Sequence, residues 1–189
     1  MNSELLRCWN TTEPLYVRYH DEEWGVPVHE ENKFFEFLVL DAFQAGLTWW
    51  LILKRRDSLR KAFDGFDPQK VASYTASDVK RLMETPNIIH NERKIKAAVN
   101  NAAQFLLIQK EFGSFDVYIW RFVGGKTIVN NFARLEDLPA QTEVSKAMSK
   151  DLKHRGFQFV GPTICYAFMQ AAGLVNDHLT GCFRNKQLS

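Results

Sequence analysis

The spacing of apolar residues is helical along most of the chain. Ile95, Val99, Ala102 and Leu106 recur at intervals of three and four, which places them on one face of a helix. The segment 32–44 is apolar on more than one face and predicts a helix buried on several sides. No series of alternating apolar and polar residues predicts a run of strands. We therefore expect a mainly α-helical fold.

Cap and turn residues mark where the predicted helices begin and end. Asp67 precedes a proline, and Thr75 stands three residues before Asp78, as in a capping box. The segment 84–91 contains a proline and interrupts the helical pattern, which predicts two helices joined by a tight hairpin. Further helices are predicted over 47–63, 114–122, 142–155 and 162–172, with a connection over 124–139.

The composition is typical of a chain that folds alone. Of 189 residues, 46% are hydrophobic and 24% are charged, enough apolar surface to offset the entropy of ordering. No linker or internal repeat divides the chain, so we expect one domain over 1–189. The apolar runs are shorter than the ~20 residues of a membrane span. The first residues lack a signal peptide's basic start and apolar core, which favours a cytoplasmic protein.

The distribution of charge tells more than its total. The formal net charge of +2 only weakly indicates a polyanionic partner. Basic residues gather in clusters, and the hairpin before Arg93 is suited to present backbone N–H groups to a phosphate. Nucleic acid is the natural partner for this pattern, and ordinary solvated helix faces are the alternative. The clusters are Lys54, Arg55, Arg56, Arg60 and Lys61; Arg93, Lys94 and Lys96; and Lys146, Lys150, Lys153 and Arg155.

Three cysteines cannot all pair within one chain, and a cytosolic setting disfavours disulfides. His178 and Cys182 are four residues apart, which on a helical turn would place an imidazole and a thiolate on one face, suited to Zn²⁺. Cys8 and His20 are candidates to complete a Cys₂His₂ set, since chain ends often lie close together. An incidental spacing is the alternative. Cys165 lies in an apolar run and is expected to be a small core residue. The other histidines are His29, His90 and His154.

Aromatic residues are dense in the first fifty positions. Asp41 stands among apolar neighbours on the predicted helix that precedes Trp49. A carboxylate in an apolar stretch needs a partner or a functional purpose, because its burial is costly. Aromatic rings and one anion are suited to hold a cationic ring by stacking and cation–π attraction. Core packing is the alternative for each ring taken alone. The rings are those of Trp9, Tyr16, Tyr19, Trp24, Trp49 and Trp50.

Four motifs occur in order along the chain: YVRYHDEEWGVP at 16–27, QAGLTW at 44–49, RGFQFVGPT at 155–163 and NDH at 176–178. Together they closely resemble the 3-methyladenine DNA glycosylase I family, over essentially the whole chain from about 7 to 182. The resemblance implies an enzyme with a helix-hairpin-helix fold that removes N3-methyladenine from alkylated DNA. It also implies a structural Zn²⁺ that clips the N- and C-terminal segments together through Cys8, His20, His178 and Cys182.

The same resemblance assigns roles to individual residues. Asp41 accepts a hydrogen bond from the base and, with Tyr19, is expected to be catalytic. Leu47, beside Gly46, is the wedge that fills the gap left by a flipped nucleotide. The segment 85–93 is the DNA-binding hairpin. The implied base-binding residues are Tyr16, Tyr19, Asp41, Trp49 and Trp9, and the implied DNA-binding residues are Leu47, Gly46, Asn87, Ile88, Arg93 and Lys94.

The chemistry of the lesion asks for few catalytic groups in the site. N3-methylation leaves a positive charge on adenine, so the base departs neutral and strong general-acid catalysis is unnecessary. A base inside a duplex must be extruded before it is inspected, at a cost of a few kcal/mol. No Schiff-base lysine is needed, so we expect a monofunctional glycosylase that does not cut the strand. We also expect a monomer.

Two departures from the family pattern bear on activity. The pocket carboxylate is usually a glutamate, and here Asp41 is one methylene shorter, which matters because a misplacement of ~1 Å lowers rates about a hundredfold. Cys8 and Trp9 are adjacent, where the family commonly has one residue between them. The alternatives are therefore a catalytically weak lesion-binding protein, a glycosylase with an altered range of alkylated bases, or a zinc-stabilised helical protein without a nucleic-acid role.

Overall fold

The computed structural model describes residues 6–188, and helices form most of that range. The α-helices are α1 (Pro14–Glu22), α2 (Glu31–Gln44), α3 (Trp49–Ala62), α4 (Pro68–Ala72), α5 (Ala76–Glu84), α6 (Glu92–Phe112), α7 (Phe115–Trp120), α8 (Glu143–His154) and α9 (Pro162–Ala171). Short 3₁₀ turns lie at Asp64–Phe66, Arg121–Val123, Leu135–Asp137 and Asn185–Gln187, and two short strands are β1 (Ile128–Val129) and β2 (Val175–Asn176). The mainly α-helical prediction is confirmed.

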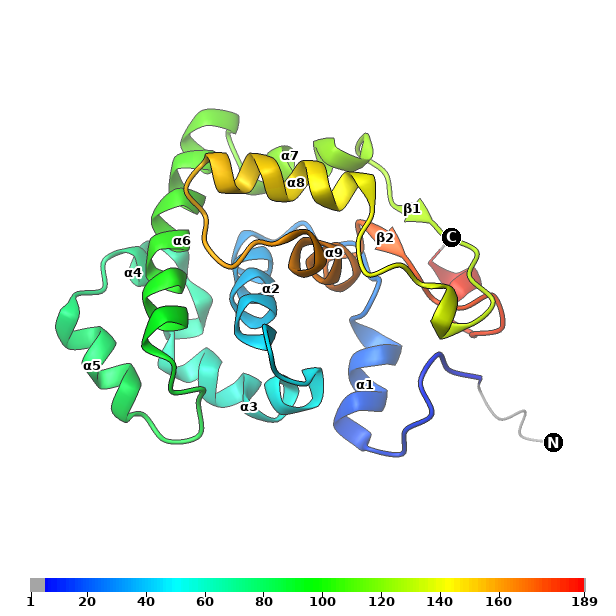
Figure 1. Ribbon diagram of the computed structural model, residues 1–189, viewed down its shortest axis with the longest axis horizontal. Coiled ribbons are helices and arrows are strands. Elements are labelled where there is room, and N and C mark those ends of the chain that lie inside the picture. The colour runs from blue at the N-terminus through cyan, green and yellow to red at the C-terminus, as the bar shows by residue number, and fades with distance from the viewer. Residues whose placement is uncertain (1–5, 189) are drawn as a thin grey trace.

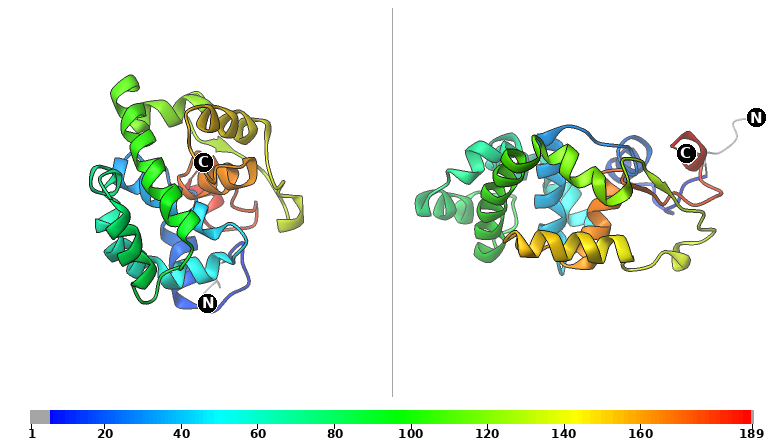
Figure 2. Two further views of the ribbon diagram at one scale, coloured as in Figure 1. Left: turned by 60° about the vertical axis from the view of Figure 1, so that its left-hand side comes forward. Right: turned by 90° about the horizontal axis from the view of Figure 1, so that it is seen from above.

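Helix α2 lies at the centre of the fold (Figure 1). All ten residues from 34 to 43 are buried, in agreement with the apolar pattern on several faces. The helix packs against α3, α6, α7 and α9. The other helices surround it in both further views (Figure 2). Burial of this much aromatic and aliphatic surface, at roughly 25 cal/mol per Å², is the main source of stability.

The predicted caps form as hydrogen bonds. The Asp67 side chain accepts from the backbone N–H groups of Gln69 and Lys70 at the start of α4. Thr75 and Asp78 make the predicted capping box of α5. Asn91 caps α6 by accepting from the N–H of Lys94. Each such cap contributes about 1 kcal/mol.

Three elements differ from the sequence-based predictions. Helix α1, which carries Tyr16 and Tyr19, was not among the predicted helices. Strands β1 and β2 pair in parallel, Ile128 beside Val175, although β1 falls inside the predicted connection. His178 and Cys182 lie in a turn after β2 and not on a helix, which corrects the helical-turn argument. The turn still brings the two side chains together.

The two ends of the described chain lie against each other (Figure 1). The N–H of Phe183 donates to the carbonyl of Leu6 at 3.0 Å. The N–H of Val28 donates to the carbonyl of Ala172 at 3.1 Å. Gly173 has a positive φ, and a Cβ there would lie 2.3 Å from the carbonyl carbon of Val26, so only glycine permits this approach. No helix of residues 6–188 is long and apolar enough to cross a membrane.

Candidate functional site

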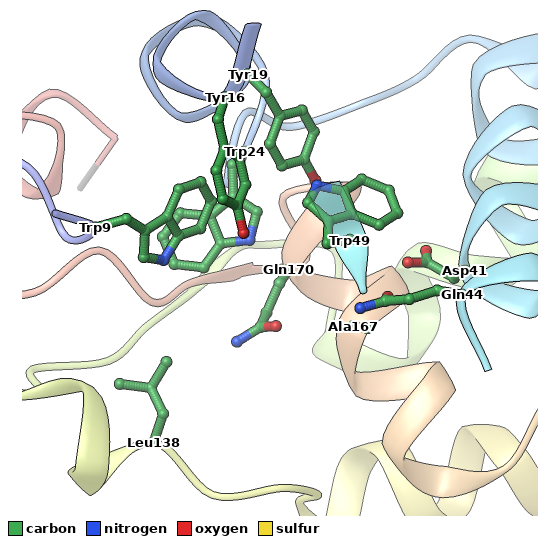
Figure 3. Close-up of a pocket in the computed structure, with 10 residues that line it drawn as sticks. All are labelled: Trp9, Tyr16, Tyr19, Trp24, Asp41, Gln44, Trp49, Leu138, Ala167 and Gln170. Carbon is green, nitrogen blue, oxygen red and sulfur yellow. The ribbon is translucent and has the colours of Figure 1, made fainter. Parts of the chain in front are cut away.

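A cavity of about 210 Å³ opens between α1, α2, α9 and the loops that precede and follow them. Figure 3 shows its lining side chains, which come from α1, α2, α3 and α9 and from the loops that hold Trp9, Trp24 and Leu138. They are Trp9, Tyr16, Tyr19, Trp24, Asp41, Gln44, Trp49, Leu138, Ala167 and Gln170. All five residues that the sequence assigns to the base pocket therefore line one cavity.

The walls of the cavity are packed aromatic rings. Pro14 at the first position of α1 favours a helix start there, and Tyr16 and Tyr19, three residues apart, share a face of that helix. The Trp9 ring stacks on the Tyr16 ring with 5.0 Å between their centroids, and the centroids of the Tyr19 and Trp49 rings are 5.2 Å apart. Rings held by one another keep their faces available to a flat guest without a large loss of side-chain freedom.

Asp41 brings an unpaired carboxylate oxygen to this cavity. The residue is only 2% exposed, and its Oδ2 has no hydrogen-bond partner among the described residues. Burial raises the pKa of Asp41 well above its usual range, which favours the protonated acid. The indole N–H of Trp49 is likewise buried without a partner. Unsatisfied buried polar atoms are costly, and their presence in one cavity points to a ligand that supplies the missing bonds.

Four lining residues were not among the sequence-based candidates, and Trp24 was a candidate only as one of the aromatic rings. Gln44 lies in the QAGLTW motif, and Trp24 lies in YVRYHDEEWGVP, so the motifs held a signal for both. Ala167 and Gln170 are three residues apart on α9 and face the cavity together. Leu138 comes from the connection after the 3₁₀ turn Leu135–Asp137, and no sequence pattern marks it.

Cys8, His20, His178 and Cys182 form a second buried cluster, close beside the first. Their ligand atoms all lie within 4.8 Å of one another. The His178 Nδ1 lies 3.4 Å from the Cys8 Sγ and 3.5 Å from the Cys182 Sγ, and the His20 Nε2 lies 3.5 Å from the Cys182 Sγ. The four residues that were expected to share a metal are therefore brought to one point.

Hydrogen bonds to groups outside the cluster fix the orientation of its two histidine rings. The His20 Nδ1 lies 2.8 Å from the Asp21 carboxylate, and the His178 Nε2 lies 2.9 Å from the carbonyl of Trp24. Each acceptor holds the ring N–H, which leaves the opposite nitrogen unprotonated toward the cysteines. Burial lowers the pKa of His178 to about 4, so the ring is neutral, as a metal ligand requires.

The thiols also favour a cation at this point. Burial raises the pKa of Cys8 to about 12, so a Cys8 thiolate is unfavourable here without a positive charge beside it. The backbone N–H of Leu179 donates to the Cys8 Sγ at 3.3 Å, as donors to metal thiolates do. Two thiols and two imidazoles in this arrangement can bind a metal and suit a four-coordinate one.

The two sites share a wall. The Trp24 ring lies 4.6 Å from the His178 imidazole on one side and 4.7 Å from the Trp9 ring on the other. Gly25 has a positive φ, and a Cβ there would approach the His178 ring at 3.2 Å. The cluster therefore supports the ring that closes one side of the cavity.

Leu47 stands on an exposed turn between α2 and α3. Gly46 takes a φ of 77°, and the N–H of Leu47 donates back to the carbonyl of Gln44 at 2.6 Å. The Thr48 side chain then caps α3 by accepting from Leu51. The Leu47 side chain is 37% exposed, unlike the buried leucines of α2 and α3. The turn thus presents an apolar side chain between Gln44 and Trp49, two residues that line the cavity.

The hairpin between α5 and α6 has a polar outside and an apolar inside. Asn87 takes a φ of 62°, and its Oδ1 accepts from Arg55 at 2.7 Å. Arg93 is exposed. Ile88, in contrast, is buried in the core, so its side chain supports the hairpin from within and does not face a DNA surface. A DNA contact through the Ile88 side chain is therefore not supported.

Lys94 also differs from its expected role. Only 6% of the residue is exposed, and its Nζ donates to the carbonyls of Phe43 and Ala45, each at 2.7 Å. These carbonyls belong to the C-terminal end of α2, where helical partners are missing. Lys94 therefore ties α6 to the turn that carries Leu47 and is not free to contact a phosphate.

Some of the clustered basic residues are occupied by acidic partners. Arg56 is buried and pairs with Glu23 and Glu36 at 2.6 and 2.8 Å. Arg155 pairs with Glu111 and Asp151. The exposed members of the clusters are Lys54, Lys61, Arg93, Lys96, Lys146, Lys150 and Lys153.

Comparison with known proteins places the chain in one family. Residues 9–185 match the sequence profile described as methyladenine glycosylase. The chain is 48% identical to the DNA-3-methyladenine glycosylase of Haemophilus influenzae, over 93% of this chain and 96% of that protein. It is 46% identical to DNA-3-methyladenine glycosylase 1 of Escherichia coli, over 93% of this chain and 95% of that protein.

A solved structure has the same fold and a bound base. It is a tyrosine-to-phenylalanine variant of 3-methyladenine DNA glycosylase I in complex with 3-methyladenine. Its TM-score to this chain is 0.90 at 39% identity, and the match covers 93% of this chain and 94% of that one. With the profile match over nearly the whole length, these similarities show that the chain belongs to the methyladenine glycosylase family.

Proposed function

We propose that this protein is a DNA repair glycosylase that hydrolyses the N-glycosidic bond of N3-methyladenine in alkylated DNA. One observation carries the proposal: an unpartnered, buried Asp41 oxygen in an aromatic-walled cavity. Family membership supports it, and a member of similar fold has been solved with 3-methyladenine bound.

The cavity suits a flat cation. N3-methyladenine carries a delocalised positive charge, which aromatic faces attract by roughly 0.5–2 kcal/mol per contact. Burial raises the pKa of Asp41 in the empty cavity, and a bound cation reverses that effect because the ionised carboxylate then has a partner. We assign Tyr16, Tyr19, Trp49 and Trp9 to base binding, with Asp41 as the hydrogen-bond acceptor.

The reaction needs little acid–base chemistry from the protein. The cationic base leaves as a neutral molecule, so the site has only to hold the base, admit a water to the sugar and stabilise charge at the anomeric carbon. We assign this stabilisation to Asp41 and Tyr19, which are both buried and both line the cavity. No lysine is among the residues that line the described cavity. This supports a monofunctional glycosylase that leaves the strand uncut.

The surface around the cavity mouth suits extrusion of a nucleotide from a duplex. Leu47 is an exposed apolar side chain on a short turn beside the cavity, as a wedge requires. Gly46 takes the positive φ of the turn, and because it lacks a side chain the backbone there is open to close approach by a strand. Asn87, the hairpin backbone at Ile88, and Arg93 are assigned to phosphate contacts in a helix-hairpin-helix element. Lys94 is assigned to the support of the wedge turn.

The metal assigned to the second cluster is Zn²⁺. Cys8, His20, His178 and Cys182 would hold it, two from each end of the chain. Its chemistry there would be structural, since all four positions of a tetrahedral site are taken by protein ligands. It would fasten the segment that carries Trp9 and Trp24 to the segment after β2. We further assign a single domain over 1–189, a monomer and a cytoplasmic location.

Base release from methylated duplex DNA tests the proposed function. The wild-type protein should release free 3-methyladenine, measured by chromatography of the ethanol-soluble fraction. Asp41→Ala should lower that release at least a hundredfold, because the acceptor for the cation is removed. Asp57→Ala, the same change at an exposed position of α3, should leave it unchanged.

Two results would contradict the proposal. Tight binding to abasic DNA without base release would favour a lesion-binding protein. Equal release by wild type and Asp41→Ala would remove the carboxylate from the mechanism.

A further inference from the structure

Gln170 lines the cavity from α9 and is held by a carboxylate behind it. Its Nε2 donates to the Asp177 Oδ2 at 2.7 Å. No hydrogen bond within residues 6–188 engages its Oε1. In Figure 3 the Gln170 side chain reaches into the cavity, with its oxygen on the side of Ala167 and Gln44 and its nitrogen on the other side.

Asp177 is held firmly in place by its own neighbours. It is buried, and its two oxygens accept from the Tyr166 hydroxyl at 2.5 Å and from the Asn130 Nδ2 at 2.6 Å, besides Gln170. Tyr166 and Gln170 are four residues apart and so share a face of α9. Asn130 and Asp177 directly follow the paired strands β1 and β2, and the N–H of Asn130 donates to the carbonyl of Asn176. The strand pair therefore sets where this carboxylate lies.

This arrangement decides which end of the Gln170 amide the cavity presents. A carboxylate only accepts hydrogen bonds, so the amide must turn its NH₂ toward Asp177. The carbonyl oxygen is then left toward the cavity. A free glutamine would expose either end to a bound base, whereas this one exposes an acceptor.

We infer that Gln170, oriented by Asp177, is a specificity-determining residue whose Oε1 accepts an N–H from an adenine-type base. Adenine carries an amino donor at position 6, where guanine carries an acceptor oxygen. An acceptor fixed on the half-buried wall of the cavity pairs with the first and repels the second. Sites built to pair with a donor N–H reject analogues that lack it far more strongly than apolar pockets reject a change in size. The inference rests on the proposed function and deepens it: N3-methyladenine is selected over N3-methylguanine.

The Gln170→Met variant tests the inference, since methionine keeps the length of the side chain and removes the acceptor. Both bases are released from the same methylated DNA and quantified together. The ratio of 3-methyladenine to 3-methylguanine released per unit time should fall about tenfold or more. Gln158→Met is the matched control, because the Gln158 side chain is exposed and only its backbone is bonded. Its ratio should equal that of the wild type.

A second measurement separates recognition from catalysis. Calorimetric titration with free 3-methyladenine should show about tenfold weaker binding by Gln170→Met than by wild type. A variant that lowers the release of both bases equally, or binds the free base as the wild type does, overturns the inference. If the wild type binds free 3-methyladenine but releases no base from DNA, the proposed function fails while the titration still decides the role of Gln170. If the wild type releases 3-methyladenine but does not bind the free base, the proposed function stands and the ratio of the two released bases decides the role of Gln170.

Discussion

The Cys/His cluster and the aromatic cavity are both buried, both contain polar groups and are separated by one tryptophan ring. They differ in whether their buried polar atoms have hydrogen-bond partners. In the cluster, each histidine has a second partner, Asp21 or the carbonyl of Trp24. In the cavity, the Asp41 Oδ2 and the Trp49 Nε1 have none among the described residues. A protein that satisfies one buried site and leaves its neighbour unsatisfied uses the first for stability and the second for a ligand.

Substitutions should therefore change stability in opposite directions at the two sites. Loss of a group from the cluster breaks a set of mutually supporting bonds. Loss of the unpaired carboxylate from the cavity removes the free-energy cost of burying it. The following changes test this contrast, from the largest expected effect to the smallest.

Removal of one cluster ligand should have the largest effect. Cys8→Ser should lose bound zinc and lower the melting temperature by at least about 10 °C, since structural zinc sites contribute several kcal/mol or more to folding. Metal content by mass spectrometry and thermal unfolding by circular dichroism measure the two together.

Cys165→Ser is the matched control for that change, because Cys165 is buried in α9 away from the cluster and its Sγ donates to the carbonyl of Val160. It should keep one zinc per chain. Native protein without stoichiometric metal, or equal metal loss in both variants, would contradict the structural assignment.

Asp41→Asn should make the free protein more stable while it abolishes base release. Burial raises the pKa of Asp41 in the folded state, so the wild type loses stability as the pH rises above the usual carboxyl range. Asparagine does not ionise, so the variant should gain roughly 1–3 kcal/mol at pH 8, the typical penalty for a buried unsatisfied group. The gain should vanish below about pH 4, where the acid is protonated in both states.

Urea unfolding at pH 8 and at pH 4 measures this gain. Asp57→Asn on the exposed face of α3 is the control and should change stability little at either pH. A variant less stable than wild type at pH 8 would show that the Asp41 carboxylate has a stabilising partner.

Leu47→Ala should change stability least, because the side chain is 37% exposed and single surface changes usually stay within about 0.5 kcal/mol. Its effect should fall on function: base release from duplex DNA should drop about tenfold, since the gap left by the extruded nucleotide is no longer filled. Leu107→Ala, at a more exposed leucine of α6, should change neither quantity. A duplex rate equal to wild type would exclude a wedge role.

The helical part of the fold was predictable because its signals are local. The apolar period placed α2, α3, α6, α8 and α9 within a few residues, and Asp67 and Thr75 identified two helix starts. The strands β1 and β2 have two residues each, too short for any alternation to be visible. Helix α1 is a nine-residue element whose aromatic and polar residues mask a helical stripe.

The sequence predicted which residues form the site better than it predicted how they are arranged. Resemblance brought together the cavity residues and the four cluster residues, whereas the turn that joins His178 to Cys182 depends on contacts far along the chain. Ile88 and Lys94 were misplaced because the burial of a side chain is decided by its tertiary neighbours, here the core and the carbonyls of Phe43 and Ala45. Nothing local marks Gln170, whose orientation depends on a carboxylate beyond the next strand.

The long sequence separation within the Cys/His cluster also bears on the order in which the protein assembles. Cys8 and His178 are 170 residues apart in sequence, so Cys8 and His20 are synthesised long before the two residues that complete the cluster. The contacts of α2 with α3 join neighbours along the chain, whereas its contacts with α9 join distant segments. The Trp24 wall of the cavity therefore gains its support from the His178 ring only after segments far apart in the sequence have met.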